Sequence, residues 1–438
     1  MALARLVATG EALGLLSVTR IALLPSEPIR ARMAGIGIRY LEFARRLPPL
    51  GVEVVLITPG APEDVPTPLE GVEIRAFERG RLAELLADCD AAVSQGQLAN
   101  DLLVEVPQLP SVIDLYDPFL VENLSYLDSL GLDPYRNDHA TWVLQLSRGD
   151  FFLCSSEEQR QFYLGFLAAL GRLNPHRVAD DPDLQSLLAV VPFGAPEDLP
   201  EPAALLDPRR PGERRLLFGG LYDWYDPWPV LEALERVDEP EWTLYFIRNP
   251  NPEATPQDLF QKVERWCRER GYWQERVQCL DWVPAERRFD LLREVDVVVA
   301  THAPSLETRL SLRTRFLEAL AAGCPVITTE GGAMSRLLRE YDAGEVVPPS
   351  DAEAVAEALR RTLGATPEFR THRQERARTL LDAFRWSKVL EPLVNFCRSP
   401  QVDSTKEDFA FRPETQAPPD ALGFRLRRRL RRWLGGRV

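Results

Sequence analysis

Three arginines and one glutamate lie close together in the final third of the chain: Arg309, Arg313, Arg315 and Glu318. Guanidinium groups bind phosphate through paired N–H donors. The start of a helix adds free N–H groups and the positive end of the helix dipole. A carboxylate further along the same helix can accept hydrogen bonds from ribose hydroxyls. These residue types favour a site for a phosphorylated nucleoside, whereas a solvated helix with i,i+4 ion pairs is the structural alternative.

The neighbouring residues predict the elements that hold these side chains. Residues 296–302 and 324–329 are short apolar, β-branched runs, which are typical of buried parallel strands. Between them, Ser311 or Thr308 can cap an amphipathic helix that contains Glu318, and Gly-Cys-Pro follows as its end. The stretch is therefore predicted to be a β-loop-α-β unit with the arginines at its helix start.

The same arrangement is predicted near the beginning of the chain. Residues 20–25 predict a strand, Gly35 and Gly37 lie in the following loop, Arg39 begins a helix, and residues 51–59 predict the next strand. We expect the loop to bind a ligand or its phosphate, although two glycines also suit a plain tight turn.

A second series of strands and helices begins after a proline-rich stretch. Residues 195–213 have the composition of a linker, and residue 215 begins the next strand. Alternating strands and helices on both sides of the linker predict an α/β protein with two Rossmann-like domains.

Composition limits the classes of function. The 438-residue chain is 45% hydrophobic with a net charge of −14, so it can bury large cores and is a poor general nucleic-acid binder. Its six cysteines lack C-x-x-C spacing and its four histidines are dispersed, which favours buried thiols in a reducing compartment and no metal site. No apolar run is long enough to span a membrane, and no secretory signal stands out. We therefore expect a cytoplasmic protein.

The C-terminal segment 421–438 has a different character. It holds seven arginines and no acid. Its apolar residues share one helical face: Leu422, Leu426, Leu430, Trp433 and Leu434. A basic amphipathic helix of this kind favours contact with an anionic membrane. A solvated tail or a helix that docks on a partner protein is the alternative.

Several runs between residues 20 and 397 occur in a specific order, namely 35–39, 191–194, 217–220, 281–284, 316–327 and 344–351. Together they resemble glycosyltransferases of the B-type fold (GT-B), close to glycosyltransferase family 4. Residues 220–227, 249–252 and 307–315 resemble a subgroup found in bacterial envelope-polysaccharide clusters.

The resemblance implies a fold and a domain plan. Two Rossmann-like domains would face each other across a cleft, with an acceptor domain at 1–194, a linker at 195–213 and a nucleotide-sugar domain at 214–373. Helices at 374–397 would cross back to pack on the first domain. A flexible tether at 398–420 would lead to a membrane-surface helix at 421–438.

The resemblance also implies a reaction. The enzyme would transfer a sugar from a nucleotide diphosphate sugar, with retention and without a metal or another cofactor. The acceptor would be a lipid-linked or envelope glycan, reached from the inner face of the cytoplasmic membrane. Closure of the two domains about the linker would exclude water.

Site residues follow from the matched motifs. Glu318 would hold the ribose, and the backbone of Trp282 and Val283 would flank the base. The expected donor site is completed by Arg309, Ser311, Arg313, Thr314, Gly219, Gly220 and His302, and the expected acceptor or phosphate loop by Gly35, Gly37 and Arg39. Glu307, Arg313 and Asp117 are the expected catalytic residues. His302 also suits a structural hydrogen bond, Glu307 a salt bridge with Arg309, and Asp117 an acceptor-binding or loop-capping role.

The chain departs from the family pattern at several positions. The family has two glutamates eight positions apart in its donor motif, but the position eight before Glu318 is Leu310, so Glu307 is the nearest replacement. The usual diphosphate-binding Arg and Lys correspond to Gly220 and Asp226. We expect Arg309, Arg313 or Arg315 to supply the missing charge. A common histidine in the first domain corresponds to Tyr116, which precedes Asp117.

Two other classes of function stay open. One is a GT-B enzyme of different chemistry, such as an epimerase or a phosphorylase, although no lysine suited to a pyridoxal Schiff base stands out. The other is a nucleotide-sugar-binding or scaffold protein with weak or no catalysis, which the missing Arg and Lys would suit.

Overall fold

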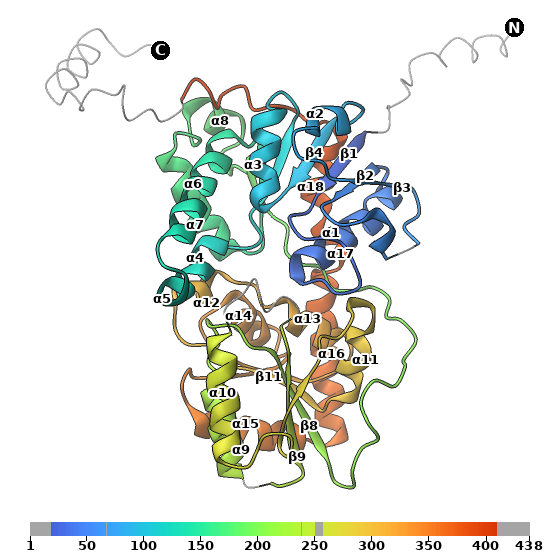
Figure 1. Ribbon diagram of the computed structural model, residues 1–438, viewed down its shortest axis with the longest axis vertical. Coiled ribbons are helices and arrows are strands. Elements are labelled where there is room, and N and C mark those ends of the chain that lie inside the picture. Colours follow the sequence, from blue (N-terminus) through green and yellow to red (C-terminus); the bar gives the residue numbers. More distant parts are fainter. Residues whose placement is uncertain (1–18, 67, 238, 250–256, 410–438) are drawn as a thin grey trace, which may run out of the picture.

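The computed structural model describes residues 19–409 apart from 67, 238 and 250–256, as two α/β domains stacked along the long axis of the molecule (Figure 1). The predicted membrane-surface helix at 421–438 lies outside the described residues, and so does part of the predicted tether. Among the residues that are described, no helix is long and apolar enough to cross a membrane.

The N-terminal domain is built on a seven-stranded sheet of order β3-β2-β1-β4-β5-β6-β7 with parallel pairing throughout. Its strands are β1 (Arg20–Leu24), β2 (Glu53–Thr58), β3 (Val72–Ala76), β4 (Ala91–Ser94), β5 (Ser111–Asp114), β6 (Phe151–Cys154) and β7 (Leu188–Val190). The inner strands are buried on both faces, as expected for apolar strands in a parallel sheet.

Helices cover both faces of this sheet (Figure 1). They are α1 (Gly35–Arg46), α2 (Leu82–Leu85), α3 (Gly96–Glu105), α4 (Phe119–Asn123), α5 (Leu127–Leu130), α6 (Asp133–Arg148), α7 (Glu157–Ala169) and α8 (Pro175–Asp180). Side chains of α1 and α3 pack in separate apolar clusters, which contain Phe43 and Leu102 respectively. The clusters hold the sheet so that the loops after its strands face the second domain.

The C-terminal domain repeats the plan with a six-stranded parallel sheet of order β10-β9-β8-β11-β12-β13. Its strands are β8 (Arg214–Gly220), β9 (Trp242–Ile247), β10 (Val277–Leu280), β11 (Val297–Ala300), β12 (Val326–Thr329) and β13 (Glu345–Val347). Its helices are α9 (Trp228–Val237), α10 (Asp258–Glu269), α11 (Arg288–Glu294), α12 (Leu306–Leu310), α13 (Thr314–Ala321), α14 (Ala333–Glu340), α15 (Ala352–Leu363) and α16 (Pro367–Ala383). The predicted fold class, two Rossmann-like α/β domains, is confirmed.

The chain passes between the domains twice, and the two passages lie together. The Ala195 N–H donates to the Phe384 carbonyl at 2.6 Å, and Ala195 bridges Arg385. Beside them, a Cβ at Gly194 would lie 2.2 Å from the Trp386 ring, so only glycine allows this close approach. The two passages between the domains are therefore held side by side.

The crossing lies later in the chain than predicted. Ala377 and Leu380 of α16 belong to the C-terminal core, whereas Trp386 of α17 (Trp386–Val389) and Leu393 of α18 (Glu391–Arg398) belong to the N-terminal core. The expectation that all of 374–397 packs on the N-terminal domain is therefore wrong for its first half. Helical periodicity showed an apolar face but not which domain would bury it.

The first part of the predicted tether is also packed. Asp403 is buried and pairs with Arg172 and Arg177, each at 2.8 Å. Lys406 pairs with Asp150 at 2.8 Å. Residues 399–409 are therefore fixed on the N-terminal domain, because buried charges are stabilised only by partners in fixed positions.

The predicted linker lies against the C-terminal domain and is bonded to it. The backbone N–H groups of Leu205 and Leu206 donate to the Glu294 carboxylate at 2.7 and 2.8 Å. Arg209 pairs with Asp296 at 2.6 Å. These contacts leave the paired crossing at Ala195 as the point where a hinge motion would be concentrated.

Candidate active site

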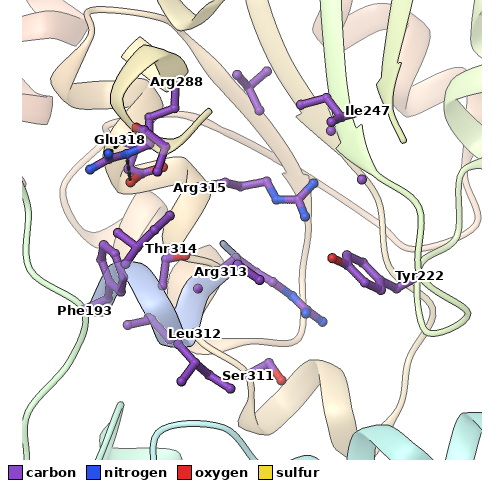
Figure 2. A pocket seen from close by; sticks show the side chains of 18 of the residues that line it. Phe193, Tyr222, Ile247, Arg288, Ser311, Leu312, Arg313, Thr314, Arg315 and Glu318 are labelled. Carbon is purple, nitrogen blue, oxygen red and sulfur yellow. Dashed lines mark hydrogen bonds and ion pairs between the residues drawn. The ribbon is translucent and has the colours of Figure 1, made fainter. Parts of the chain in front are cut away.

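A cavity of about 420 Å³ lies between the domains, at the carboxyl ends of strands from both sheets. The N-terminal domain contributes Met33 to Ile36, Ile38, Tyr116 to Pro118, Glu122 and Phe193. The C-terminal side contributes Gly219, Gly220, Tyr222, Trp282, Val283, Arg288, Ser311 to Arg315 and Glu318, among others (Figure 2). An interdomain cavity with few polar groups among apolar walls is the usual form of a small-molecule site.

Contacts between the domains hold this cavity together. The Ala285 N–H donates to the Ala31 carbonyl at 3.0 Å. On another part of the seam, Arg336 pairs with Glu158 at 3.0 Å. In this structure the two domains are therefore already in contact around the cavity.

The segment that carries the arginines forms two helices and not the single helix predicted. Ser305, and neither Ser311 nor Thr308, caps α12 by accepting the Thr308 N–H at 3.0 Å. The chain is then extended at Ser311, and α13 begins at Thr314 without a side-chain cap. The N-terminal N–H groups of α13 therefore face the cavity without a competing side chain, which suits an anion.

Arg313 and Arg315 both line the cavity and extend toward Tyr222 (Figure 2). Arg315 donates to the Phe218 carbonyl at 2.7 Å and to the Tyr225 hydroxyl at 2.6 Å. A Cβ at Gly219, whose φ is +95°, would lie 2.4 Å from Arg315 Nη1, so glycine is needed for this approach. The site thus holds two cations at the start of α13.

Arg309 does not belong to this group. It is exposed on α12 and does not line the cavity. The prediction that Arg309 binds the donor is therefore wrong for this structure.

Glu318 lines the cavity one turn into α13, and its Oε1 accepts a hydrogen bond from Arg288 Nε at 2.6 Å (Figure 2). Arg288 comes from α11 and was not predicted. Trp282 and Val283 line the same cavity, and the Trp282 indole N–H is buried without a partner. This part of the site therefore offers a carboxylate that is paired with a guanidinium.

The opposite wall holds two carboxyl groups, Asp117 and Glu122, of which Glu122 was not predicted. Burial raises the pKa of both, and a hydrogen bond joins them, so one proton is shared between them with Glu122 as donor. The Ser311 hydroxyl donates to Glu122 Oε1 at 3.3 Å across the domain seam. The pair is suited to hydrogen bonds with sugar hydroxyls or to proton exchange.

Glu307, a predicted catalytic residue, does not line the cavity. It is only 3% exposed, and its Oε2 accepts from Arg313 Nη2 at 2.6 Å, while its Oε1 has no hydrogen-bond partner. The carboxylate therefore positions Arg313 and does not face a substrate. The proposed salt bridge with Arg309 is replaced by one with Arg313.

His302 lies behind the cavity wall. It is 2% exposed, and its ring packs 4.8 Å from that of Tyr225, which does line the cavity. Burial lowers the pKa of His302 well below its usual value, and the charges of Arg313 and Arg315 add to the effect. His302 is therefore neutral and supports Tyr225, contrary to the prediction that it contacts the donor sugar.

The residues predicted to form an N-terminal ligand loop lie in different surroundings in the structure. Gly35 lines the cavity, and a Cβ there would lie 3.5 Å from the Tyr116 hydroxyl. Arg39 is fully buried, with both guanidinium edges bonded to Asp114 at 2.7 and 3.0 Å and to two backbone carbonyls. Arg39 therefore stabilises the domain and cannot bind acceptor or phosphate, because all of its donors but one are occupied inside the core.

Within the described ranges, no three His, Cys, Asp or Glu side chains are placed to hold a metal ion. The cations available at the cavity are the guanidinium groups of Arg288, Arg313 and Arg315.

Comparisons with known proteins agree with this geometry. Residues 214–365 match the family model described as "Glycosyl transferases group 1". A search of curated proteins finds no significant match. The matched segment contains β8, the break at 311–313 and Glu318, so it includes the C-terminal half of the cavity.

Solved structures of similar fold cover nearly the whole chain. Sucrose-phosphate synthase from Thermosynechococcus elongatus is 16% identical with a TM-score of 0.63, covering 87% of this chain and 98% of its own. HepE from Anabaena, solved with UDP and glucose, is 16% identical with a TM-score of 0.58 over 87% and 100% of the two chains. WaaG, a glycosyltransferase involved in lipopolysaccharide biosynthesis, is 16% identical with a TM-score of 0.56 over 86% and 100%.

The architecture is therefore that of GT-B proteins, and the site lies in the cleft between the domains. With the match over 214–365, the chain is an enzyme of the glycosyltransferase class.

Proposed function

We propose that this enzyme transfers a sugar from a nucleotide diphosphate sugar to a glycan acceptor, with retention and without a metal ion or other cofactor. The observation that carries the proposal is the uncapped start of α13, which faces the interdomain cavity with Arg313 and Arg315 beside it. Free helix N–H groups and two guanidiniums suit a diphosphate.

The donor would lie mainly on the C-terminal domain. Glu318, held by Arg288 at 2.6 Å, would accept hydrogen bonds from the ribose, and the Trp282–Val283 segment would flank the base. As the bond from the sugar C1 to the phosphate oxygen breaks, negative charge grows on the diphosphate beside α13. Preorganised donors at that position lower the barrier, because they need no reorganisation during the reaction.

The acceptor would approach from the N-terminal wall. Its hydroxyl oxygen forms the new bond to C1 on the face from which the diphosphate departs, and its proton passes to a leaving phosphate oxygen. Asp117 and Glu122 would orient the acceptor through hydrogen bonds. Movement about the crossing at Ala195 would open and close the cavity and so limit hydrolysis by water.

The acceptor is proposed to be a lipid-linked or envelope glycan, with the enzyme in the cytoplasm at the inner face of the membrane. The basic amphipathic sequence of 421–438 supports this, because such segments bind anionic lipid surfaces. The fold shared with WaaG, which acts in lipopolysaccharide biosynthesis, is consistent with the same setting.

A donor screen tests the proposal. Calorimetric titration with UDP-, GDP-, ADP- and dTDP-glucose should identify one nucleotide sugar that binds, and Glu318→Gln should weaken that binding. An assay for release of the free nucleotide should then detect slow turnover. Failure of all four donors to bind, or equal binding by Glu318→Gln, would argue against the proposed donor site.

A nucleotide-sugar-binding protein without transferase activity is the second candidate. It is favoured by the position of Glu307, which pairs with Arg313 and leaves the cavity without the first glutamate of the family motif. Donor binding without turnover on any acceptor extract would favour this candidate.

A further inference from the structure

Behind the N-terminal wall of the cavity, a carboxylate is bound at the start of a helix whose first residues, Gly35 and Ile36, line the cavity. Glu27 lies in the loop after β1, and its Oε1 accepts the Ala34 N–H at 2.7 Å while its Oε2 accepts the Gly37 N–H at 2.9 Å. Ala34 is the N-cap residue of α1 and offers no side-chain cap of its own. Two of the N–H groups at this helix start are therefore already bonded to a carboxylate of the protein, which offsets part of the positive end of the helix.

Glu27 fills this position closely. A Cβ at Gly37 would lie 3.1 Å from Glu27 Oε2 and 2.8 Å from the Met33 Cβ, so glycine is needed for the carboxylate to approach this turn. Ala34 and Gly35, on the same loop, line the cavity. A ligand that enters the cavity from this side therefore meets a helix start whose positive end is partly offset.

No positively charged side chain of the N-terminal domain lines the cavity, and Arg30 acts on the Glu27 carboxylate from outside it. The ionisable lining residues that the N-terminal domain contributes are Tyr116, Asp117 and Glu122, with no Arg, Lys or His among them. Arg39, the nearest buried cation of the domain, is bonded to Asp114 and to backbone carbonyls. Arg30 and Arg32 are exposed on the loop and do not line the cavity.

The opposite wall has the reverse character, since Arg288, Arg313 and Arg315 all line the cavity from the C-terminal domain. Positive and negative groups are thus separated across one small cavity. An anionic group is stabilised on one side and repelled on the other, because charges in a partly buried site are weakly screened.

We propose that Glu27 is a specificity-determining residue that excludes phosphorylated and carboxylated acceptors, so that the acceptor presents an uncharged, hydroxyl-bearing sugar to this wall. The inference rests on the proposed function, because it assigns the N-terminal wall to the acceptor. Glu27 occupies the start of α1, and the Asp117–Glu122 pair accepts hydrogen bonds from sugar hydroxyls. The anionic portion of the reactants is then confined to the donor.

The test compares the wild type with Glu27→Gln, which keeps the size of the side chain and removes its charge. Glucose 6-phosphate is titrated calorimetrically into each protein, with and without saturating UDP, which occupies the arginine side of the cavity. We expect no measurable binding by the UDP-loaded wild type. Glu27→Gln is expected to bind glucose 6-phosphate at least tenfold more tightly than the wild type.

Two further variants make the result decisive. Glu27→Asp retains the charge and should behave as the wild type, whereas Glu27→Ala opens the helix start fully and should bind glucose 6-phosphate as Glu27→Gln does. Circular dichroism and the melting temperature show whether each variant is folded. Methyl glucoside, which lacks the phosphate, should bind all folded variants equally.

The outcomes separate this inference from the proposed function. Binding of glucose 6-phosphate by the wild type as tightly as by Glu27→Gln would overturn it, and so would absence of binding by both Glu27→Gln and Glu27→Ala. Failure of UDP to bind would count against the proposed donor site alone, because the titrations without UDP still report the effect of Glu27.

Discussion

Arg313 Nη2 lies 2.6 Å from Glu307 Oε2, and this ion pair spans the break between α12 and α13. Glu307 is 3% exposed, and Arg313 lines the cavity. A buried carboxylate at this distance fixes the guanidinium where a leaving diphosphate is proposed to bind. Loss of either partner leaves the other charge in a poorly solvated position.

Replacement of Arg313 by Ala should impair the chemical step. We expect kcat to fall by about 10²- to 10³-fold, because removal of one preorganised donor to transition-state charge costs roughly this factor. The donor KM should also rise. Steady-state kinetics with the donor identified by titration measures both effects. Arg309→Ala, on the exposed face of α12, is the matched control, and equal kinetics for the two variants would exclude Arg313 from the diphosphate site.

Glu307 should act through Arg313. Glu307→Gln should lower kcat, and the double variant Glu307→Gln/Arg313→Ala should be no slower than Arg313→Ala alone. A double-mutant cycle on kcat should give a coupling energy of about 0.5–3 kcal/mol, the range for residues in direct contact. Additive effects would instead indicate that Glu307 acts on the substrate independently of Arg313.

Gly219→Ala should reduce activity more than its effect on stability explains. Its φ of +95° disfavours any side chain, and the new Cβ would lie 2.4 Å from Arg315 Nη1. Gly271→Ala is the control, since Gly271 has a φ of +69° with no atom within 4 Å of the added Cβ. Both variants should lose about 1–2 kcal/mol of unfolding free energy from the left-handed backbone, and only Gly219→Ala should lose turnover.

The Glu122 carboxyl should make stability depend on pH. Burial raises the pKa of the Glu122 carboxyl in the folded state. The contribution of Glu122 to the unfolding free energy is therefore fully present at pH values below about 4.5, and it is lost as the pH rises through the folded pKa. The unfolding free energy of the wild type should therefore fall relative to that of Glu122→Gln between pH 5 and pH 9. Urea unfolding at several pH values measures the difference, and Glu63→Gln, at an exposed position, should run parallel to the wild type.

Asp403 should show the opposite dependence. Hydrogen bonds from Arg177 and Arg172 outweigh the effect of burial and lower its pKa to about 2. The contribution of Asp403 to the unfolding free energy is therefore present above the unfolded pKa near 3.8, and it is lost as the pH falls through about 2. Asp403→Asn should lower the unfolding free energy by roughly 3–5 kcal/mol at neutral pH, because Arg172 and Arg177 lose the carboxylate that pairs with them.

Urea unfolding from neutral pH into acid measures this loss. The gap between Asp403→Asn and the wild type should be constant above pH 4 and should close below it. Asp408→Asn, on the exposed side of the same segment, is the control. A gap that does not depend on pH would show that the ion pairs of Asp403 are not the source of the stability.

Much of the fold could be predicted because its signals are local. The inner strands are apolar over short runs, as in β11, since a parallel sheet covered on both faces favours apolar residues. The position of Glu318 one turn inside a helix could be predicted for the same reason. The crossing at Ala195 and Phe384 could not, because an apolar helix face does not specify the domain that buries it.

The site was predicted in part. The predicted donor-site residues Ser311, Arg313, Thr314 and Glu318 line one cavity together, because they are neighbours in sequence. Arg288 and Glu122 were missed, since they reach Glu318 and Ser311 across separations of 30 and 189 residues. No periodicity or spacing in a single sequence reports such pairs.

The order of apolar runs, glycine turns and charged helix starts determined by itself that two Rossmann-like domains form and that arginines stand at the start of the helix that carries Glu318. Tertiary structure alone decided which charges are free to act. Arg39 and Glu307 have the residue types of a site, yet each is bonded inside the protein, to Asp114 and to Arg313. Whether a charge binds a ligand or a neighbour depends on burial and on distant partners, which only the folded chain brings together.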